Sequence, residues 1–397
     1  MTSAATPEGP PRALLLWLSA ANFVIGMGAF VVVGLLPQIA PAFARDAAAA
    51  GAVMTVYALV YTVASPVLVA LTGRADRRAV LLAGLMLFAV GAAVCALASG
   101  FGALLAGRAV MAAGAGLVTP VTAAIAAGLA PPALRGRALA TVFGGLTLAQ
   151  VAGVPAGAWL GQTFGWPAAF AATAALAAAT ALVLARRVPR GIAVPATGLA
   201  ALGRALASGW RMAAVAFGVL FLGGVYCVYA FLGVLLVDRM GLSPGGLSLV
   251  LAVYGLGAVA GNALGGRLAD RIGPERTLMI LCAAQAVLLP AVALAELPLV
   301  PMVALVVAWS IAGWSFMAAQ QARLAALDPA GTPVMLALNA AAVYLAAAIG
   351  TSAGGAALRA LDGWAGPGLA GAAFMGLAAL SLLVVPRLRR RDQFVSR

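Results

Sequence analysis

The stretch GRLADRIGPER, from Gly266 to Arg276, is the densest patch of charge between two long apolar runs of the chain. A shorter echo, GRADRR, runs from Gly73 to Arg78. The aspartates of the two stretches, Asp270 and Asp76, lie 194 residues apart, which is close to half of the 397 residues. The same polar hinge in each half indicates that the chain was built by doubling one unit.

The composition is that of a polytopic membrane protein. Hydrophobic residues make up 64% of the chain and charged residues 9%, with a mean hydropathy of +1.09, whereas an ordinary globular domain carries about 25% charge. A helix needs roughly 20 mostly apolar residues to cross a bilayer. The apolar runs predict an all-α fold of twelve transmembrane helices in two pseudo-symmetric six-helix bundles. The spans are expected near 13 to 37, 49 to 71, 79 to 99, 102 to 129, 139 to 162, 166 to 185, 212 to 237, 246 to 266, 277 to 296, 298 to 321, 333 to 357 and 365 to 386.

The basic residues set the orientation. All 24 are arginine, and the formal net charge is +14. Only Arg45, Arg239 and Arg359 fall in one set of alternate loops, while twenty fall in the tails and the other set. Since basic loops stay on the cytoplasmic side, both termini are expected there, and the charge indicates topology beside anionic lipid rather than a nucleic-acid site. The predicted parts are tails at 1–12 and 387–397, bundles at 13–185 and 212–386, and a basic cytoplasmic linker at 186–211.

Glycines at a spacing of four mark one face of two predicted helices, and small residues there allow a close helix contact. The fifth and eighth spans run antiparallel in this topology, so their glycine strips are expected to face each other across the junction of the halves and to let the halves rock. Ordinary packing within one bundle is the alternative. The two triplets are Gly153, Gly157 and Gly161, and Gly257, Gly261 and Gly265.

Polar side chains inside spans are costly, so they are candidate functional residues. Together they predict a polar and aromatic substrate cavity between the halves, although a hydrogen bond between two helices is the alternative role of each one. The cavity candidates are Asn22, Tyr57, Tyr61, Arg108, Thr119, Gln150, Tyr226, Tyr229, Trp309, Trp314, Asn339 and Tyr344.

Arg108 is the sharpest single candidate, because an arginine inside a span must be hydrated or paired. Snorkelling toward the nearer end of its helix is the alternative. All ten acidic residues map to tails, loops or span ends, and the chain has no histidine. The usual proton carriers are therefore missing from mid-membrane, and an unpaired Arg108 would leave the cavity positive, which favours neutral or anionic substrates.

The sequence offers no residues for an enzyme, a metal site or a cofactor. Acid pairs, metal-ligand spacings and a Ser-His-Asp set cannot be assembled from it. The three cysteines, Cys95, Cys227 and Cys282, fall within apolar runs and are expected to be small core residues.

The hinge pattern, the twelve spans and the basic linker together resemble the major facilitator superfamily, in particular its twelve-helix drug:proton antiporter branch. Gly266 to Arg276 is similar to the loop motif of this family, and Gly73 to Arg78 is similar to a shortened copy. Arg108 with Gly114 and Gly116 resembles its fourth-helix motif, whose arginine is associated with proton coupling. The segment from Gly153 through Pro155 and Gly157 to Gly161 resembles the fifth-helix motif of exporters.

The resemblance also assigns roles. The two loops would form a conformational latch that stabilises the outward-open state. The latch residues would be Gly73, Asp76, Arg77, Arg78, Gly266, Asp270, Arg271, Gly273 and Arg276. GMGAFVVVGLLPQIA, from Gly26 to Ala40, resembles the first helix of sugar-efflux and chloramphenicol-efflux permeases, which carry a glutamate where this chain has Ala29. Without that glutamate, Arg108 and Asp46 are the candidates for coupling.

The sequence thus predicts an exporter of small organic molecules such as drugs, sugars or metabolites, monomeric and placed in the inner (plasma) membrane. It would work by alternating access of its two halves, with possible proton coupling. An uncoupled facilitator or exchanger, and a receptor or scaffold of the same fold that does not transport, remain open alternatives.

Overall fold

In the computed structural model, described here for residues 12–131, 134–192, 203, 206–329, 331–361 and 363–395, the chain is a bundle of long helices. The first half contains α1 (Arg12–Phe30), α2 (Val32–Ala42), α3 (Ala47–Ala50), α4 (Ala52–Leu71), α5 (Arg77–Ala96), α6 (Phe101–Leu129), α7 (Arg135–Leu148), the π-helix η2 (Ala149–Gly153), α8 (Val154–Phe164) and α9 (Trp166–Arg187). The second half contains α11 (Gly209–Tyr229), α12 (Leu232–Met240), α13 (Pro244–Ile272), α14 (Pro274–Leu294), α15 (Leu299–Leu327), α16 (Thr332–Ala360) and α17 (Ala365–Val395).

Twelve segments in this described part are long and apolar enough to cross a membrane, which confirms the predicted fold class. Three spans consist of consecutive helices: α1 with α2, α7 through α8, and α11 with α12. The last candidate span ends at Val385, but helix α17 continues to Val395 through residues predicted as a tail. The predicted tail at 1–12 lies outside the described residues except for Arg12, as does most of the linker between 193 and 205.

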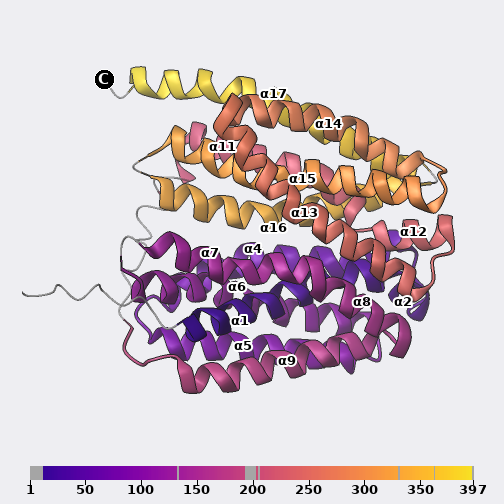
Figure 1. Ribbon diagram of the computed structural model, residues 1–397, viewed down its shortest axis with the longest axis horizontal. Coiled ribbons are helices and arrows are strands. Elements are labelled where there is room, and N and C mark those ends of the chain that lie inside the picture. Colours follow the sequence, from indigo (N-terminus) through magenta and orange to yellow (C-terminus); the bar gives the residue numbers. More distant parts are fainter. Residues whose placement is uncertain are drawn as a thin grey trace, which may run out of the picture.

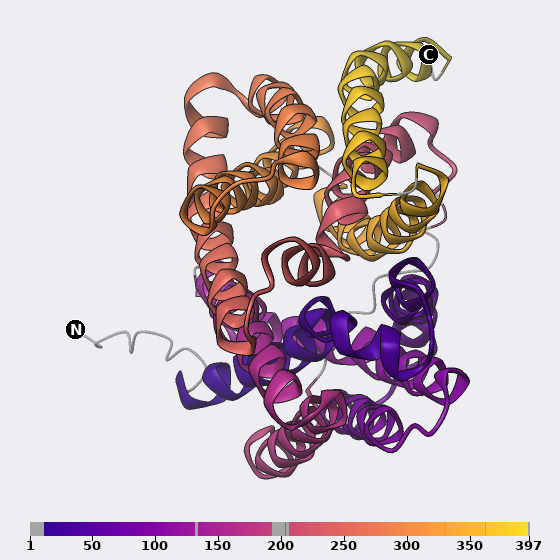
Figure 2. The ribbon, with the colours of Figure 1, turned by 90° about the vertical axis from the view of Figure 1, so that its right-hand side faces the viewer.

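The two halves lie side by side, the first in indigo to magenta and the second in rose through orange to yellow (Figure 1). Here the terminal end means the end where α1 begins and α17 ends, and the far end means the opposite one. A view along the helices from the far end separates the two halves into two groups (Figure 2). Within the first half α6 packs on α4 and α5, and within the second half α13 packs on α15 and α11 on α16 and α17.

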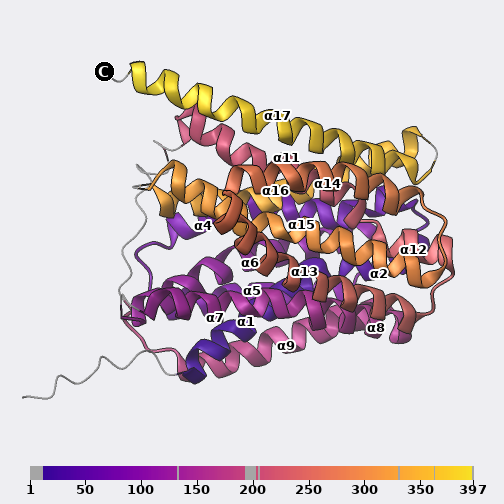
Figure 3. The same cartoon turned by 45° about the horizontal axis from the view of Figure 1, so that its top comes forward.

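Contacts between the halves come chiefly from three pairs of spans. Helix α2 packs on α12, α3 and α4 pack on α16, and η2 and α8 pack on α13. Segments α2, α8 and α12 all lie at the far end of their spans (Figures 1 and 3), and α3 follows α2 directly in the chain. The halves are therefore joined chiefly through their far parts.

Two spans break at corresponding places. Helix α1 gives way to α2 at Val31, and α11 gives way to α12 at Ala230 and Phe231. Broken helices at matching positions of two repeats are typical of transporters, where they mark the substrate region. The repeated break is the internal symmetry that the doubled hinge stretch predicts.

The three cysteines are buried free thiols, as expected for small core residues.

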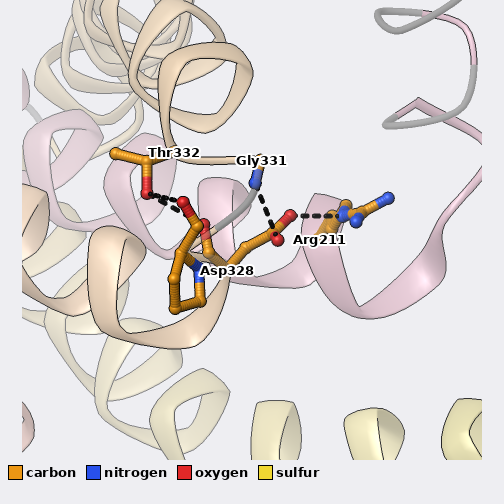
Figure 4. Close-up of polar contacts among 5 residues, drawn as sticks. Arg211, Asp328, Gly331 and Thr332 are labelled. Atoms are coloured by element: carbon orange, nitrogen blue, oxygen red, sulfur yellow. Dashed lines mark hydrogen bonds and ion pairs between the residues drawn. The ribbon is translucent and has the colours of Figure 1, made fainter.

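Asp328 ties the start of the second half to the turn between α15 and α16 (Figure 4). Its carboxylate accepts hydrogen bonds from Arg211 Nε at 2.8 Å and from the backbone N–H of Gly331 at 3.0 Å. Thr332 Oγ1 donates to the carbonyl oxygen of the same aspartate at 2.9 Å. Because Asp328 is only 8% exposed, this carboxylate depends on its partners for the solvation that water would give.

Replacing Asp328 with alanine is expected to lower the free energy of unfolding by about 1 to 3 kcal/mol, because buried donors lose a charged acceptor. The melting temperature of the purified protein at a fixed heating rate measures this effect. Glu296→Ala removes a carboxylate from an exposed loop position and serves as the control. Equal melting temperatures for the two variants would contradict the role of Asp328.

Candidate substrate path between the halves

Arg108 lies fully buried in α6, with 0% of its surface exposed. Its guanidinium donates to three backbone carbonyl oxygens: Nη1 to Gly28 at 2.6 Å, Nη2 to Ala29 at 3.0 Å and Nε to Val53 at 3.1 Å. The ring of Tyr57 covers the group, with its centroid 4.2 Å from Cζ. A buried cation is tolerated where such acceptors replace its hydration. Arg108 is therefore paired with backbone dipoles and does not snorkel.

The carbonyls that hold Arg108 are available because α1 breaks beside them. The last regular bond before the break runs from Val31 N to Met27 O at 2.9 Å, and the next starts from the Val31 carbonyl, which accepts from Gly34 N at 3.0 Å. The final carbonyls of a helix have no partner within that helix. Two of them, on Gly28 and Ala29, accept from Arg108 instead.

Gly28 is required by close packing at this point. A Cβ there would lie 2.6 Å from Phe88 Cζ, closer than real Cβ atoms come, and 3.0 Å from Met111 Cε, which is also a tight contact. The helix break, the glycine and the arginine thus form one structural unit. None of the ion pairs among the described residues includes Arg108, and three carbonyl dipoles surround the cation, so the positive cavity stays a prediction.

An aromatic cluster joins the halves next to this unit. Tyr61 of α4 stacks on Tyr344 of α16 with ring centroids 3.6 Å apart, and Tyr57 approaches the same ring at 6.4 Å. Phe30, at the end of α1, lies parallel to Tyr226 of α11 at 6.4 Å. The interhalf aromatic cluster is defined as Phe30, Tyr57, Tyr61, Tyr226, Tyr229 and Tyr344.

A polar contact and further rings extend the cluster. Tyr229 donates through its hydroxyl to Gln150 Oε1 of η2 at 3.2 Å, across the halves. In the second half Tyr229 stacks on Tyr254 at 4.9 Å, and Trp309 lies 5.3 Å from Tyr254. Trp314 Nε1 donates to the Tyr254 hydroxyl at 3.3 Å. The structure thus brings together eight of the predicted cavity residues in addition to Arg108.

The other three predicted cavity residues bond or pack within their own half. Asn22 Nδ2 donates to Thr122 Oγ1 at 2.9 Å, and Thr122 in turn donates to the carbonyl of Thr119. Asn339 is buried, 2% exposed, beside Gly218 of the neighbouring α11. For Asn22 this contact matches the alternative of a helix-to-helix role, whereas the bond at Thr119 goes to its backbone carbonyl within α6.

Two residues at the contact between the halves, Phe30 and Gly255, are not among the candidates that the sequence predicts. Phe30 is an apolar residue in an apolar span, so composition gives it no distinct signal. Gly255 lies outside the glycine triplets, yet a Cβ on it would come 2.3 Å from the Gln150 carbonyl oxygen in the other half. Its helix α13 there lies directly against the backbone of η2, and such π-helical turns are frequent at functional sites.

The glycine strips do not face each other, so that prediction is wrong. Added Cβ atoms on Gly153, Gly157 and Gly161 would meet Met27, Val31 and Leu35, all in α1, α2 or the break between them. Those on Gly257, Gly261 and Gly265 would meet Ser310, Ile311 and Ser315 of α15. Each strip packs inside its own half, which is the alternative of ordinary bundle packing. Pro155 lies in the first turn of α8, where a proline needs no N–H partner.

The first predicted latch loop bonds to backbone groups. Asp76 Oδ1 accepts from the N–H of Gly191, which follows α9. Arg77 donates to the carbonyls of Thr72 and Gly73, and Arg78 donates to that of Ala185. The carboxylate of Asp76 and the two arginines therefore bond to backbone amide and carbonyl groups, and the ion pairs of the described residues do not join them.

The second latch loop ends helix α13 and starts α14. Asp270, Arg271 and Arg276 are exposed, and Gly273 has a φ of 86°, a conformation that favours glycine. Gly266 is half-buried, with Ala318 of α15 3.8 Å from an added Cβ.

Asp46, the other coupling candidate, lies on the rim of the far end. Its carboxylate caps α3 by accepting from Ala49 N at 2.5 Å and lies 3.9 Å from Arg359 Nη1 of α16. It is 58% exposed and bonds none of the groups around Arg108. Asp46 and Arg108 therefore belong to separate sites in this arrangement.

Comparison with known proteins agrees with this geometry. The profile of the Major Facilitator Superfamily matches residues 18–328 and 216–396. The inner membrane transport protein YdhP of Escherichia coli (strain K12) is 30% identical over 94% of this chain and 96% of its own length. The chloramphenicol resistance protein of Streptomyces lividans is 35% identical over 65% of this chain and 67% of its own length.

Among solved structures, a bacterial homolog of the human lysosomal transporter Spinster, in an inward-facing and unoccupied conformation, superposes with a TM-score of 0.75. It shares 18% sequence identity, and the match covers 96% of this chain and 98% of that one. At this identity the likeness concerns the fold.

Proposed function

Because the chain belongs to the Major Facilitator Superfamily, a family of transporters rather than enzymes, we propose that it exports small neutral organic molecules across the inner membrane by alternating access of its two halves. The observation that carries this proposal is the pairing of Arg108 with three carbonyl oxygens beside an aromatic cluster that joins the halves.

The arrangement of the halves supports alternating access. They meet chiefly through far-end segments, and the arginine-rich loops, with Arg74, Arg135 and Arg186 among them, lie at the terminal end. Since basic loops stay in the cytoplasm, the terminal end would face inward. The halves would then be closed toward the outside, and rocking about the broken helices would open that side.

The direction of transport is supported by one relative and by one motif. The relative with the printed name chloramphenicol resistance protein is 35% identical where it aligns, and YdhP is named an inner membrane transport protein. The motif is the segment from Gly153 to Gly161, which resembles the fifth-helix motif of exporters and whose glycines pack α8 closely on α1 and α2. Both support efflux across the inner membrane, with a monomer as the transporting unit.

Neutral substrates follow from the electrostatics of the path. The Arg108 cation is already bonded and covered by Tyr57, so it offers little attraction to an anion. Tyrosine rings with hydroxyls favour a compact molecule that has one aromatic or apolar part and a few hydrogen-bonding groups. Organic cations would find no carboxylate on the aromatic cluster as defined above.

Transport is proposed to be uncoupled from protons. In the described residues, the groups that bond Arg108 are carbonyls and the Met111 sulfur, and none of the three ion pairs includes Arg108. Ala29 contributes a backbone carbonyl, which does not titrate, where the resembling permeases carry a glutamate. A facilitator or exchanger needs no titratable group there.

Flux of radiolabelled chloramphenicol into proteoliposomes, with and without an imposed pH gradient, tests the proposal. We expect saturable flux in both cases without accumulation against the substrate gradient. A one-to-one proton antiporter would instead accumulate substrate about tenfold per pH unit. Gradient-driven accumulation would overturn the uncoupled mechanism, and a clear preference for an organic cation such as tetraphenylphosphonium would overturn the neutral substrate class. Absence of flux for neutral, anionic and cationic probes would favour the scaffold alternative.

A further inference from the structure

A second buried arginine, Arg323, lies near the end of α15, and its surroundings differ from those of Arg108. Its side chain is 1% exposed. Nη1 donates to Gln320 Oε1 at the long distance of 3.5 Å, and the guanidinium lies over the ring of Phe217, 5.2 Å from its centroid. Among the residues that the structure describes, Nε and Nη2 have no hydrogen-bond partner. Arg323 is thus a buried cation with unused donors.

The nearby carboxylate does not satisfy these donors. Glu275 Oε1 lies 3.9 Å from Arg323 Nε, which exceeds the length of a hydrogen bond, and Glu275 is 54% exposed. A half-exposed carboxylate at this distance offsets little of the desolvation cost of the buried arginine. Burying a cation without full hydrogen bonding is costly, so an additional acceptor beside Arg323 would be strongly favoured.

A cavity of about 410 Å³ lies against this arginine at the terminal end of the second half. Arg276 gives its wall a second positive charge, and Ile272, Ala326 and Leu327 give it an apolar part. The wall also includes Gly273, the residue before α14, which is a helix of 21 residues. The first N–H groups of such a helix and its dipole attract anions.

We propose that this cavity binds an anionic phosphate group, with Arg323 and Arg276 as its ligands. A guanidinium holds phosphate oxygens through two parallel hydrogen bonds, which matches the unused Nε and Nη2 of Arg323. The exposed Glu275 turns toward water when the anion enters. The apolar wall suits the start of the acyl chains of a lipid, and basic pockets between helices at the cytoplasmic surface bind phospholipid head groups.

The site is independent of the transport path and of the proposed substrate. Its walls include residues 272–276, which belong to the second latch loop, so a bound anion holds that loop against the end of α15. Phosphate can reach the cavity on a lipid head group or as a free ion, and the experiment separates the two sources.

Thermal melting of the delipidated protein in a neutral detergent tests the site. The probes are dioctanoyl phosphatidylglycerol, which is anionic, and inorganic phosphate at constant ionic strength. We expect a saturable rise in melting temperature with at least one probe. The half-saturating concentration should increase by about tenfold or more in Arg323→Gln, because the lost bonds are charge-assisted.

Two further variants make the result decisive. Ala326→Trp fills the cavity from an exposed position and leaves both arginines, so it should weaken binding even if Arg323→Gln folds poorly. Arg267→Gln removes an exposed charge of the same loop outside the cavity wall and should bind like the unmodified protein.

A response to phosphatidylglycerol alone identifies a lipid site, and an equal response to both probes identifies a site for the free ion. The proposal is overturned if neither probe gives a saturable rise. It is also overturned if Ala326→Trp binds like the unmodified protein, or if Arg267→Gln loses as much affinity as Arg323→Gln.

Discussion

Arg108→Met is expected to lower the free energy of unfolding by about 3 kcal/mol and to reduce flux at least tenfold, because buried carbonyls left without a donor cost about 1 to 3 kcal/mol each. The carbonyls concerned belong to Gly28, Ala29 and Val53, so the loss reaches two neighbouring spans. Removal of a desolvated cation offsets part of this cost. The break in α1 would then lose the group that fixes its geometry.

A lysine at position 108 separates the effect of the positive charge from the effect of the guanidinium geometry. Arg108→Lys keeps the positive charge, but an ammonium is a compact charge that cannot span three acceptors in the plane of a guanidinium. We expect its stability and flux to lie between those of Arg108→Met and the unmodified protein. Melting temperature and chloramphenicol flux in proteoliposomes measure both effects, and Arg137→Met, at an exposed position of α7, is the control.

The pH dependence distinguishes a structural role from proton coupling. If Arg108 holds the helix break, the variants should lose the same fraction of flux with and without a pH gradient. Loss of gradient-driven flux with exchange preserved would instead assign Arg108 to proton coupling and contradict the structural role.

Gly255→Ala is expected to reduce flux by about tenfold or more while the chain still folds. A rise of about 1.4 kcal/mol in the free energy of the closed state lowers the population of that state relative to the open state about tenfold. The added Cβ would lie 2.3 Å from the Gln150 carbonyl oxygen and 2.7 Å from Val151 Cα, which are backbone atoms of the other half. Neither can move without a shift of η2. The clash therefore acts on the contact between the halves and leaves the packing inside each half intact.

Opening of the far end provides a second measurement for Gly255→Ala. A cysteine introduced at Thr55, whose hydroxyl lies 3.3 Å from Ser352 Oγ in the other half, should react faster with an impermeant maleimide in this variant. The three native cysteines are buried and add little background. Gly246→Ala on the same helix is the matched control, because its nearest contact would be an ordinary 3.4 Å. Equal flux and equal labelling rates in both variants would show that the close contact is unimportant.

The fold followed from sequence because hydropathy and the repeated hinge stretch report directly on bilayer spans and on duplication. The partners of Arg108 could not be predicted in the same way. They are backbone carbonyls released by a break at Val31, within the run AFVVVG, and no proline lies next to that break. Side-chain identity therefore gave no sign of which acceptors would be free.

The glycine strips show a different limit. Their spacing correctly indicates a close helix contact, but spacing alone carries no information on which neighbouring helix makes it. Gly157 and Gly261 each pack on a helix of their own half. Close backbone contacts across the halves are made by Gly255 against Gln150 and by Gly233 against Val33, and neither glycine belongs to a triplet. The tyrosines of the cluster could be predicted as candidates, because a hydroxyl group in an apolar span is a distinct signal in the sequence. Phe30, which stacks with Tyr226, has no such group.

The far-end closure also determines which features of the medium can influence the transport cycle. It consists mostly of ring stacking and apolar packing between α2 and α12 and between α4 and α16. Across this closure the described residues form one ion pair, Asp46 with Arg359, at 3.9 Å and more than half exposed. Salt screens such exposed pairs and leaves stacked rings unaffected. We therefore expect the ionic strength of the medium at the far end to have little effect on the balance between open and closed forms, so that the transport rate stays nearly constant between dilute and saline media.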